Sequence, residues 1–139
     1  MADDTPEAAL YAWLQNLPGL NNLVGGRIRT GAADVNDVRP LVVIEPPVLS
    51  PYQHTTGHAG MAESIIPIHC EGNSYKEARD ISLLIFDQFK GGFHGQMHDT
   101  YVSHVVPTIR GKRPNVVGGN DQNFHSVEVQ LQMVHEIPA

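Results

Sequence analysis

The chain has almost no cysteine and no long apolar run. Its single cysteine, Cys70, excludes an internal disulfide and fits a protein made in a reducing cytoplasm. No stretch approaches the ~18 consecutive apolar residues that a membrane-spanning helix requires. Residues 1–5 are acidic and lack the basic and then apolar order of a signal peptide. We therefore expect a soluble protein without a membrane partner, folded as a single domain over residues 1–139, because this length is too short for two domains.

Basic residues are also scarce. The chain has nine Lys and Arg against fifteen Asp and Glu, which gives a formal net charge of −6 at pH 7. A protein whose main task is to hold nucleic acid needs a dense positive surface, so this charge balance argues against that class. It is compatible with an acidic surface past which DNA slides without binding, because like charges repel.

Signatures of catalysis and cofactor binding are missing. The basic, glycine-rich segment 111–122 lacks the Gly-x-x-x-x-Gly-Lys-Ser/Thr order of a phosphate-binding loop. The sequence contains neither a Gly-x-Ser-x-Gly nucleophile elbow nor a His-Glu-x-x-His zinc motif. Cys70 lies in an alternating segment, and we interpret it as a small buried apolar residue. The sequence therefore predicts neither an enzyme nor a cofactor.

Eight histidines are unusual for this length. His54 with His58, and His94 with His98, have the i,i+4 spacing that would place two imidazoles on one face of a helix. Both pairs lie in glycine-containing segments that do not have a helical pattern. We therefore interpret them as polar surface or strand-end residues and predict no metal site. A histidine-rich metal-binding module or metal-dependent enzyme is the alternative interpretation.

A strand-to-helix junction is the most informative pattern in the chain. Residues 61–71 alternate as a strand, and Ser74 and Glu77 follow with the spacing of a capping box. The Ser74 hydroxyl can accept from the Glu77 N–H, and the Glu77 carboxylate can accept from the Ser74 N–H. A helix is predicted over 75–89, and Gly91-Gly92 ends it because glycine enters the left-handed conformation without steric cost. Its apolar face has the spacing of a helix laid on a sheet: Ala78, Ile81, Leu84, Ile85 and Phe89.

A second helix is predicted at the start of the chain. Thr5-Pro6-Glu7 supplies a capping hydroxyl, a proline at the first helical position and a carboxylate near the positive end of the helix dipole. Pro18-Gly19 breaks this helix, and residues 20–24 have the pattern of one further turn. The apolar stripe that we expect to face the core is Leu10, Trp13, Leu14 and Leu17.

Strands are predicted over residues 27–29, 41–45, 61–71, 100–110 and 124–136. The last alternates most clearly, and its predicted buried face is Val127, Val129, Leu131 and Met133. Pro67 cannot donate to a ladder, so it must lie at an edge, at a bulge or at an unpaired site.

Two long loops are expected between these strands. Segment 46–60 is predicted to be a long loop or a loosely paired hairpin tip, and segment 111–122 an extended hairpin loop. The order of elements predicts an α+β fold: a mostly antiparallel sheet of about four to five strands with helices packed on one face.

Several motifs of this chain resemble a known family. They are Leu10-Tyr11-Ala12-Trp13-Leu14, Leu23-Val24-Gly25-Gly26-Arg27-Ile28, Pro40-Leu41-Val42-Val43 and Ser74-Tyr75-Lys76-Glu77-Ala78. A long alternating C-terminal strand follows these motifs. In this order they look like the motifs of the tail-completion or tail-terminator proteins of long-tailed bacteriophages. This family also occurs in prophages and gene-transfer particles. The resemblance covers roughly residues 8–136, and segment 46–60 departs most from it.

The resemblance implies a structural virion protein that forms a ring, usually a hexamer, at the head-proximal end of the tail tube. Such a ring ends tube growth and presents a surface to the head. The implied partners are further copies of the chain, the tail tube protein and the head–tail connector proteins, and DNA passes through the lumen without specific binding. The implied location is the virion, with the host cytoplasm during assembly.

Contacts within such an assembly are predicted at the two loops and at a sheet edge. We expect an exposed edge near Pro67 to meet the next subunit head to tail. The candidate contact residues are Tyr52, His54, His58, Arg110, Lys112, Arg113 and Asn115. For the basic cluster, a solvated hairpin base is the alternative. For the whole chain, a small stand-alone α+β binding domain is a further alternative.

Overall fold

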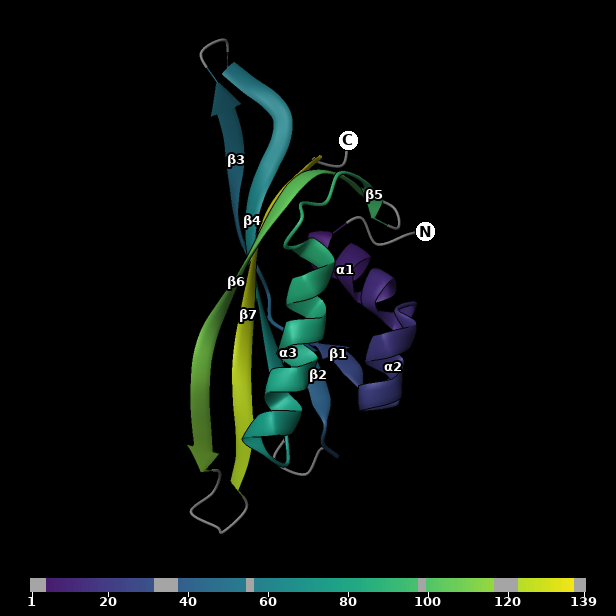
Figure 1. The fold of residues 1–139 in the computed structure, drawn as a ribbon. Helices are drawn as coiled ribbons and strands as arrows, with labels where there is room; N and C mark the ends of the chain where they lie inside the picture. Colours follow the sequence, from purple (N-terminus) through teal and green to yellow (C-terminus); the bar gives the residue numbers. More distant parts are fainter. Residues whose placement is uncertain (1–4, 32–37, 55–56, 98–99, 117–122, 137–139) are drawn as a thin grey trace.

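The computed structural model describes residues 5–31, 38–54, 57–97, 100–116 and 123–136. Within these ranges it describes every side chain except those of residues 49–60 and 111–124. The described chain forms three helices and seven strands, with all three helices on one side of the sheet (Figure 1). The helices are α1 (Pro6–Gln15), α2 (Pro18–Val24) and α3 (Tyr75–Phe89). None of these helices combines the length and the apolar character that crossing a membrane requires. The strands are β1 (Ile28–Thr30), β2 (Leu41–Ile44), β3 (Val48–His54), β4 (Gly57–Gly72), β5 (Gly95–Met97), β6 (Thr100–Val116) and β7 (Asn123–Glu136).

The strands form a single sheet in the order β1-β2-β4-β7-β6-β5, and β3 pairs with β4. The β1–β2 pair is parallel and every other pair is antiparallel. The α+β class and the helices on one face are as predicted, but the sheet has seven strands rather than four or five. The two additional strands are β3, which pairs with the first half of β4 beside β2, and the short β5, which pairs with the start of β6.

The described parts of the two predicted loops contain strands. In segment 46–60 the hairpin alternative is confirmed: β3 and the first residues of β4 pair over Val48–His54, with a register shift after Tyr52. In segment 111–122, β6 continues to Val116 and stays paired with β7. Glycine and proline indicated loops here, but backbone pairing within two long hairpins outweighs that local preference. The β3–β4 hairpin extends beyond the helical layer (Figure 1). Residues 55–56 and 117–122 lie outside the described part of the chain.

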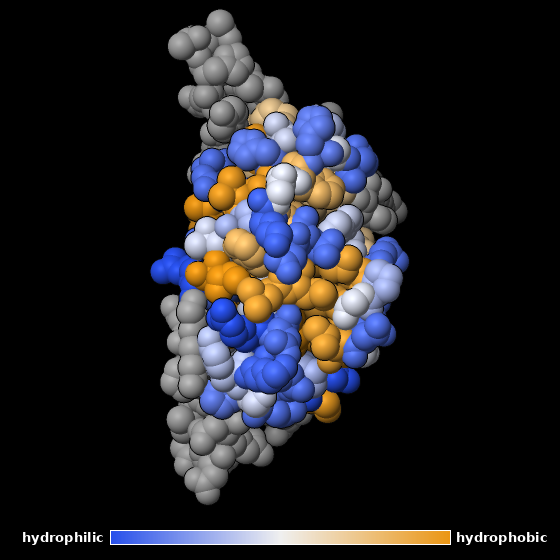
Figure 2. Space-filling model, viewed as in Figure 1, coloured by the Kyte–Doolittle hydropathy of each residue, from blue (hydrophilic) through white to orange (hydrophobic). Residues whose placement is uncertain are grey.

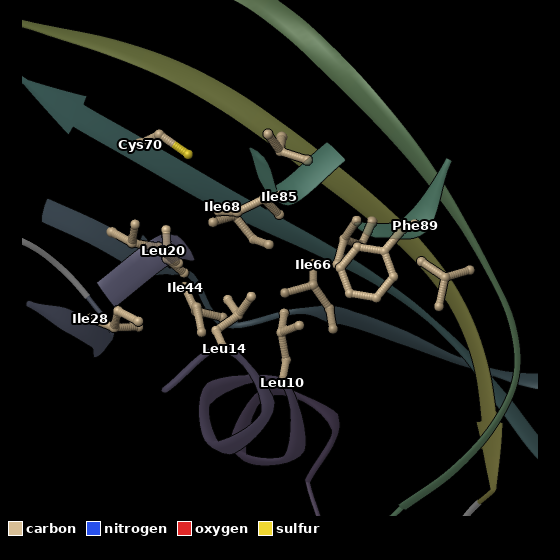
Figure 3. Close-up of a cluster of buried hydrophobic side chains, with 14 of the residues drawn as sticks. Leu10, Leu14, Leu20, Ile28, Ile44, Ile66, Ile68, Cys70, Ile85 and Phe89 are labelled. Carbon is tan, nitrogen blue, oxygen red and sulfur yellow. The ribbon is translucent and has the colours of Figure 1, made fainter. Parts of the chain in front are cut away.

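The core lies between the helices and one face of the sheet (Figure 3). Leu10 and Leu14 of α1 and Ile85 and Phe89 of α3 meet the alternating apolar residues of the central strands, including Ile66. Each fully buried Leu, Ile or Phe contributes roughly 1.5–3 kcal/mol through loss of apolar surface from water. The residues predicted to be buried, Cys70 of β4 and the alternating face of β7, lie here together with Ile66 and Ile68: Val127, Val129, Leu131 and Met133 form that face.

The strand-to-helix junction follows the predicted cap with one difference. The Ser74 hydroxyl accepts from the Glu77 N–H at 3.2 Å, as expected. The Glu77 carboxylate accepts from the Asn73 N–H at 2.8 Å rather than from the Ser74 N–H, one residue earlier than the capping-box pattern. Gly72 lies so close to the first turn that a Cβ there would be 2.8 Å from the Ala78 nitrogen. At the other end, Gly92 has φ of 90°, the left-handed conformation predicted for the helix stop.

Pro67 lies in the middle of the sheet, so the prediction of an exposed edge there is wrong. It pairs with Gln130 of β7, and its carbonyl oxygen accepts from the Glu45 N–H at 2.9 Å on the opposite side of β4. In an antiparallel ladder the N–H and C=O of one residue face the same neighbouring strand. The proline nitrogen therefore faces the break between β2 and β3. Of the three predicted positions for Pro67, an edge, a bulge or an unpaired site, the unpaired site is the one observed.

Candidate interaction surfaces

The structure divides the seven predicted contact residues between two hairpins. Tyr52 and His54 lie on β3 and His58 on β4, whereas Arg110, Lys112, Arg113 and Asn115 lie on β6. These hairpins extend from opposite ends of the sheet, so the seven residues do not form one surface (Figure 1). The Arg110 side chain is exposed. The side chains of the other six lie outside the described part of the structure, so their contact roles stay predictions.

The sheet face that points away from the helices, called the open face below, carries exposed apolar residues. Val48, Ile65, Gln132 and Val106 are successive partners across β3, β4, β7 and β6 and form one row. They face away from the core because Ile66, Leu131, Met133 and Val105, their neighbours in sequence, are buried in it. Val48 is 68% exposed and Val106 is 47% exposed. The row therefore begins and ends on an exposed valine.

This row was not predicted from the sequence. Val48 lies in a segment that was predicted to be a long loop or a loosely paired hairpin tip, so no face could be assigned to it. Val106 lies in a predicted strand, and its alternation with the buried Val105 was the signal available. Which residues lie opposite it depends on the strand register, which the sequence pattern does not give.

A polar network occupies another part of the open face. Arg39 contacts the Glu71 carboxylate through two nitrogens, at 3.0 and 2.9 Å. The His69 ring nitrogen Nε2 lies 2.6 Å from Glu45 and 3.8 Å from Glu128. Arg39 precedes β2 and Glu45 follows it, so these contacts join both ends of β2 to β4, and His69 also lies near Glu128 of β7.

The described histidines are mostly engaged by protein groups. The His94 ring lies edge-on to Tyr101, with a centroid distance of 5.6 Å, and its Nδ1 donates to the Ser103 carbonyl oxygen at 3.1 Å. Among the described residues, no group of three or more His, Cys, Asp or Glu side chains is arranged to hold a metal ion. The pairing of His54 with His58 and the position of His98 lie outside the side chains that the structure describes. The metal alternative is therefore untested at those positions.

His135 is buried and has a well-defined hydrogen-bonding role. Its Nδ1 donates to the Glu136 carbonyl oxygen at 2.9 Å, so its Nε2 accepts from the Ser64 hydroxyl at 2.7 Å. Cys70 is buried in the core, as the sequence predicted. Burial, and to a lesser extent the Glu71 charge, raise the pKa of the Cys70 thiol, so it stays a thiol and is a poor nucleophile.

A hollow of about 450 Å³ lies between the start of α1 and the end of β1. Its lining is Thr5, Glu7, Ala8, Tyr11, Thr30, Gly31, Ile44 and Pro46. The Thr5 hydroxyl accepts from the Ala8 N–H as the helix cap. These lining residues include one carboxylate, that of Glu7, and no histidine, cysteine or lysine.

The helical layer also presents some apolar surface. Figure 2 shows apolar residues near the middle of this side of the molecule, with hydrophilic residues around them. Leu23 of α2 is the most exposed large apolar residue among the described helical positions. Most other apolar side chains here are at least half buried, and they include Trp13, which packs on Phe89 at 5.1 Å between ring centroids. Scattered surface of this kind is ordinary for a folded protein.

The same fold occurs in a solved structure described as "Virion of native gene transfer agent (GTA) particle". One chain of that structure superimposes on this protein with a TM-score of 0.65 and 13% sequence identity, and the match covers 95% of each chain. No family model and no curated protein sequence matches this chain. At this identity the similarity establishes the fold, over nearly the full length of both chains.

Proposed function

We propose that this protein is a structural component of a phage-type virion. In this proposal it forms a ring, of six subunits by the family resemblance, at the head-proximal end of a tail tube. The ring ends tube growth, joins the tail to the head connector, or does both. The observation that carries the proposal is the end-to-end structural similarity to a chain of a gene transfer agent virion particle.

In this proposal the protein has no catalytic turnover. The thiol of Cys70 is buried, and the described residues that line the hollow beside α1 include no histidine, cysteine or lysine. The exposed valines of the open face are a more suitable basis for docking than for catalysis. The net charge of −6 favours a lumen through which DNA passes without sticking.

Deletion of the gene in the strain that carries it tests the proposal. Particles would be induced, purified and examined by negative-stain electron microscopy, with the gene restored from a plasmid as the control. Overlong tail tubes would identify a terminator, and tails of normal length detached from full heads would identify a joining protein. Intact particles of normal infectivity or transfer activity would overturn the proposal.

A further inference from the structure

Besides the short end strands β1 and β5, two longer strand edges of the sheet have no ladder partner in the described part of the chain. β3 pairs with β4 on one side, and no described strand pairs with its other side. β6 pairs with β5 only over Thr100–Val102, so its outer edge is open from Ser103 onward. Unpaired strand edges readily accept another strand, and proteins that keep them exposed commonly use them for association.

The two edges are complementary in position and direction. They lie on opposite sides of the sheet, so contact between them is head to tail and generates a ring or a filament. The β3–β4, β4–β7 and β7–β6 pairs are all antiparallel, so β3 and β6 run in opposite directions. When a second copy is related to the first by rotation about an axis along the strands, β6 of the first therefore meets β3 of the second as an antiparallel pair.

The two exposed valines lie on the two strand edges that would pair. Val106 is on β6 and Val48 is on β3, and they belong to the same cross-strand row of the open face. In a closed ring all copies stand at the same height, so the row of one copy continues into the row of the next. Val106 then lies opposite Val48 of the neighbouring copy, and two exposed apolar side chains cover each other.

Charge also favours the head-to-tail arrangement of copies. β6 carries Arg110, Lys112 and Arg113, a third of the nine basic residues in an acidic chain. β3 carries no Lys, Arg, Asp or Glu. Pairing of β6 with β3 therefore brings no like charges together, whereas pairing of two β6 edges would.

Prolines limit the length of the pairing. Pro107 follows Val106, and Pro51 lies three residues after Val48. Each lacks an N–H and therefore cannot donate a ladder bond, and the stretches without proline are 103–106 on β6 and 48–50 on β3. The two valines belong to these stretches.

We infer that neighbouring subunits join by pairing β6 of one copy with β3 of the next, centred on Val106 and Val48. This inference rests on the proposed ring and identifies the surface that closes it. The sheets of adjacent subunits become continuous, with the helices of every copy on the same side.

Engineered cysteines at the two valines test the inference. Within one chain these positions are three strand spacings apart, roughly 14 Å, which is too far for a disulfide. The native thiol of Cys70 is buried and does not interfere. The variant carrying both Val48→Cys and Val106→Cys would be oxidised mildly, as purified protein and in purified particles, and resolved on non-reducing gels. We expect a ladder of linked subunits that ends at the size of the closed ring.

Single variants provide the matched controls. V48C and V106C mixed together should give only a heterodimer, and each alone should stay monomeric on the gel. V38C combined with V106C should give no ladder, because Val38 is 66% exposed but lies outside both edges. Absence of the ladder from both preparations of the double variant, or homodimers of V106C alone, would overturn the inference. Failure of the proposed function is distinguishable, because the protein would then be missing from purified particles, whatever the gel pattern.

Discussion

Replacement of Gly72 by alanine tests the packing at the strand-to-helix junction. A Cβ at this position would lie 2.8 Å from the Ala78 backbone nitrogen and 2.9 Å from the Glu77 Cβ. The first of these atoms belongs to the helix backbone and cannot rotate away, so α3 has to shift against the end of β4. Overpacking of this kind costs about 1–3 kcal/mol of the free energy of unfolding. For a domain of this size we expect the midpoint temperature of unfolding to fall by roughly 4–12 °C.

Gly91 provides the matched control. An added Cβ there meets no atom within 4 Å, and Gly91 is not among the glycines with positive φ. G91A should therefore unfold within a few degrees of the parent protein, or slightly higher, because alanine restricts the unfolded chain by about 0.4–1 kcal/mol. Calorimetry or circular dichroism of both variants gives the comparison. Equal stability of G72A and the parent, or a larger loss in G91A than in G72A, would refute the proposed close approach.

Three further predictions concern the core, a buried hydrogen bond and the open face. Phe89→Ala should lower the free energy of unfolding in urea by roughly 3–5 kcal/mol, because this side chain is fully buried under α1; a loss below 1 kcal/mol would contradict the packing. Ser64→Ala should cost about 1–3 kcal/mol in the same assay, since it leaves the buried His135 acceptor unpaired; an unchanged midpoint would contradict the hydrogen bond. Val106→Asp should change monomer stability by no more than about 0.5 kcal/mol but prevent ring formation in native mass spectrometry, whereas Val38→Asp should leave the ring intact.

Local patterns predicted the parts of the fold that local interactions decide. The bounds of α3 follow from the Ser74 cap and the glycines after Phe89, and the buried face of β7 follows from its strict alternation. The shift of the Glu77 contact to the Asn73 N–H depends on how the strand enters the helix, which a spacing rule does not specify.

Strand pairing was less predictable because it depends on distant segments. Segment 46–60 has prolines and glycines typical of a loop, yet its residues pair with the long strand β4. The backbone hydrogen bonds of this pairing outweigh the local preference for a loop. The pairing of distant segments also explains why Pro67 lies in the centre of the sheet. β4 is longer than β2 and β3, and Pro67 lies where β2 and β3 meet along it. The candidate contact residues lie on two hairpins and their contact roles stay predictions, whereas the row from Val48 to Val106 required the register of four strands.

The central claim is that this chain is a structural part of a virion tail. Cryo-electron microscopy of particles purified from the strain that carries the gene tests it most directly. The account predicts a ring of density at the head-proximal end of the tail tube into which this seven-stranded fold fits, one copy per subunit. Particles that lack the protein altogether, or that carry it only in the head shell, would contradict the account.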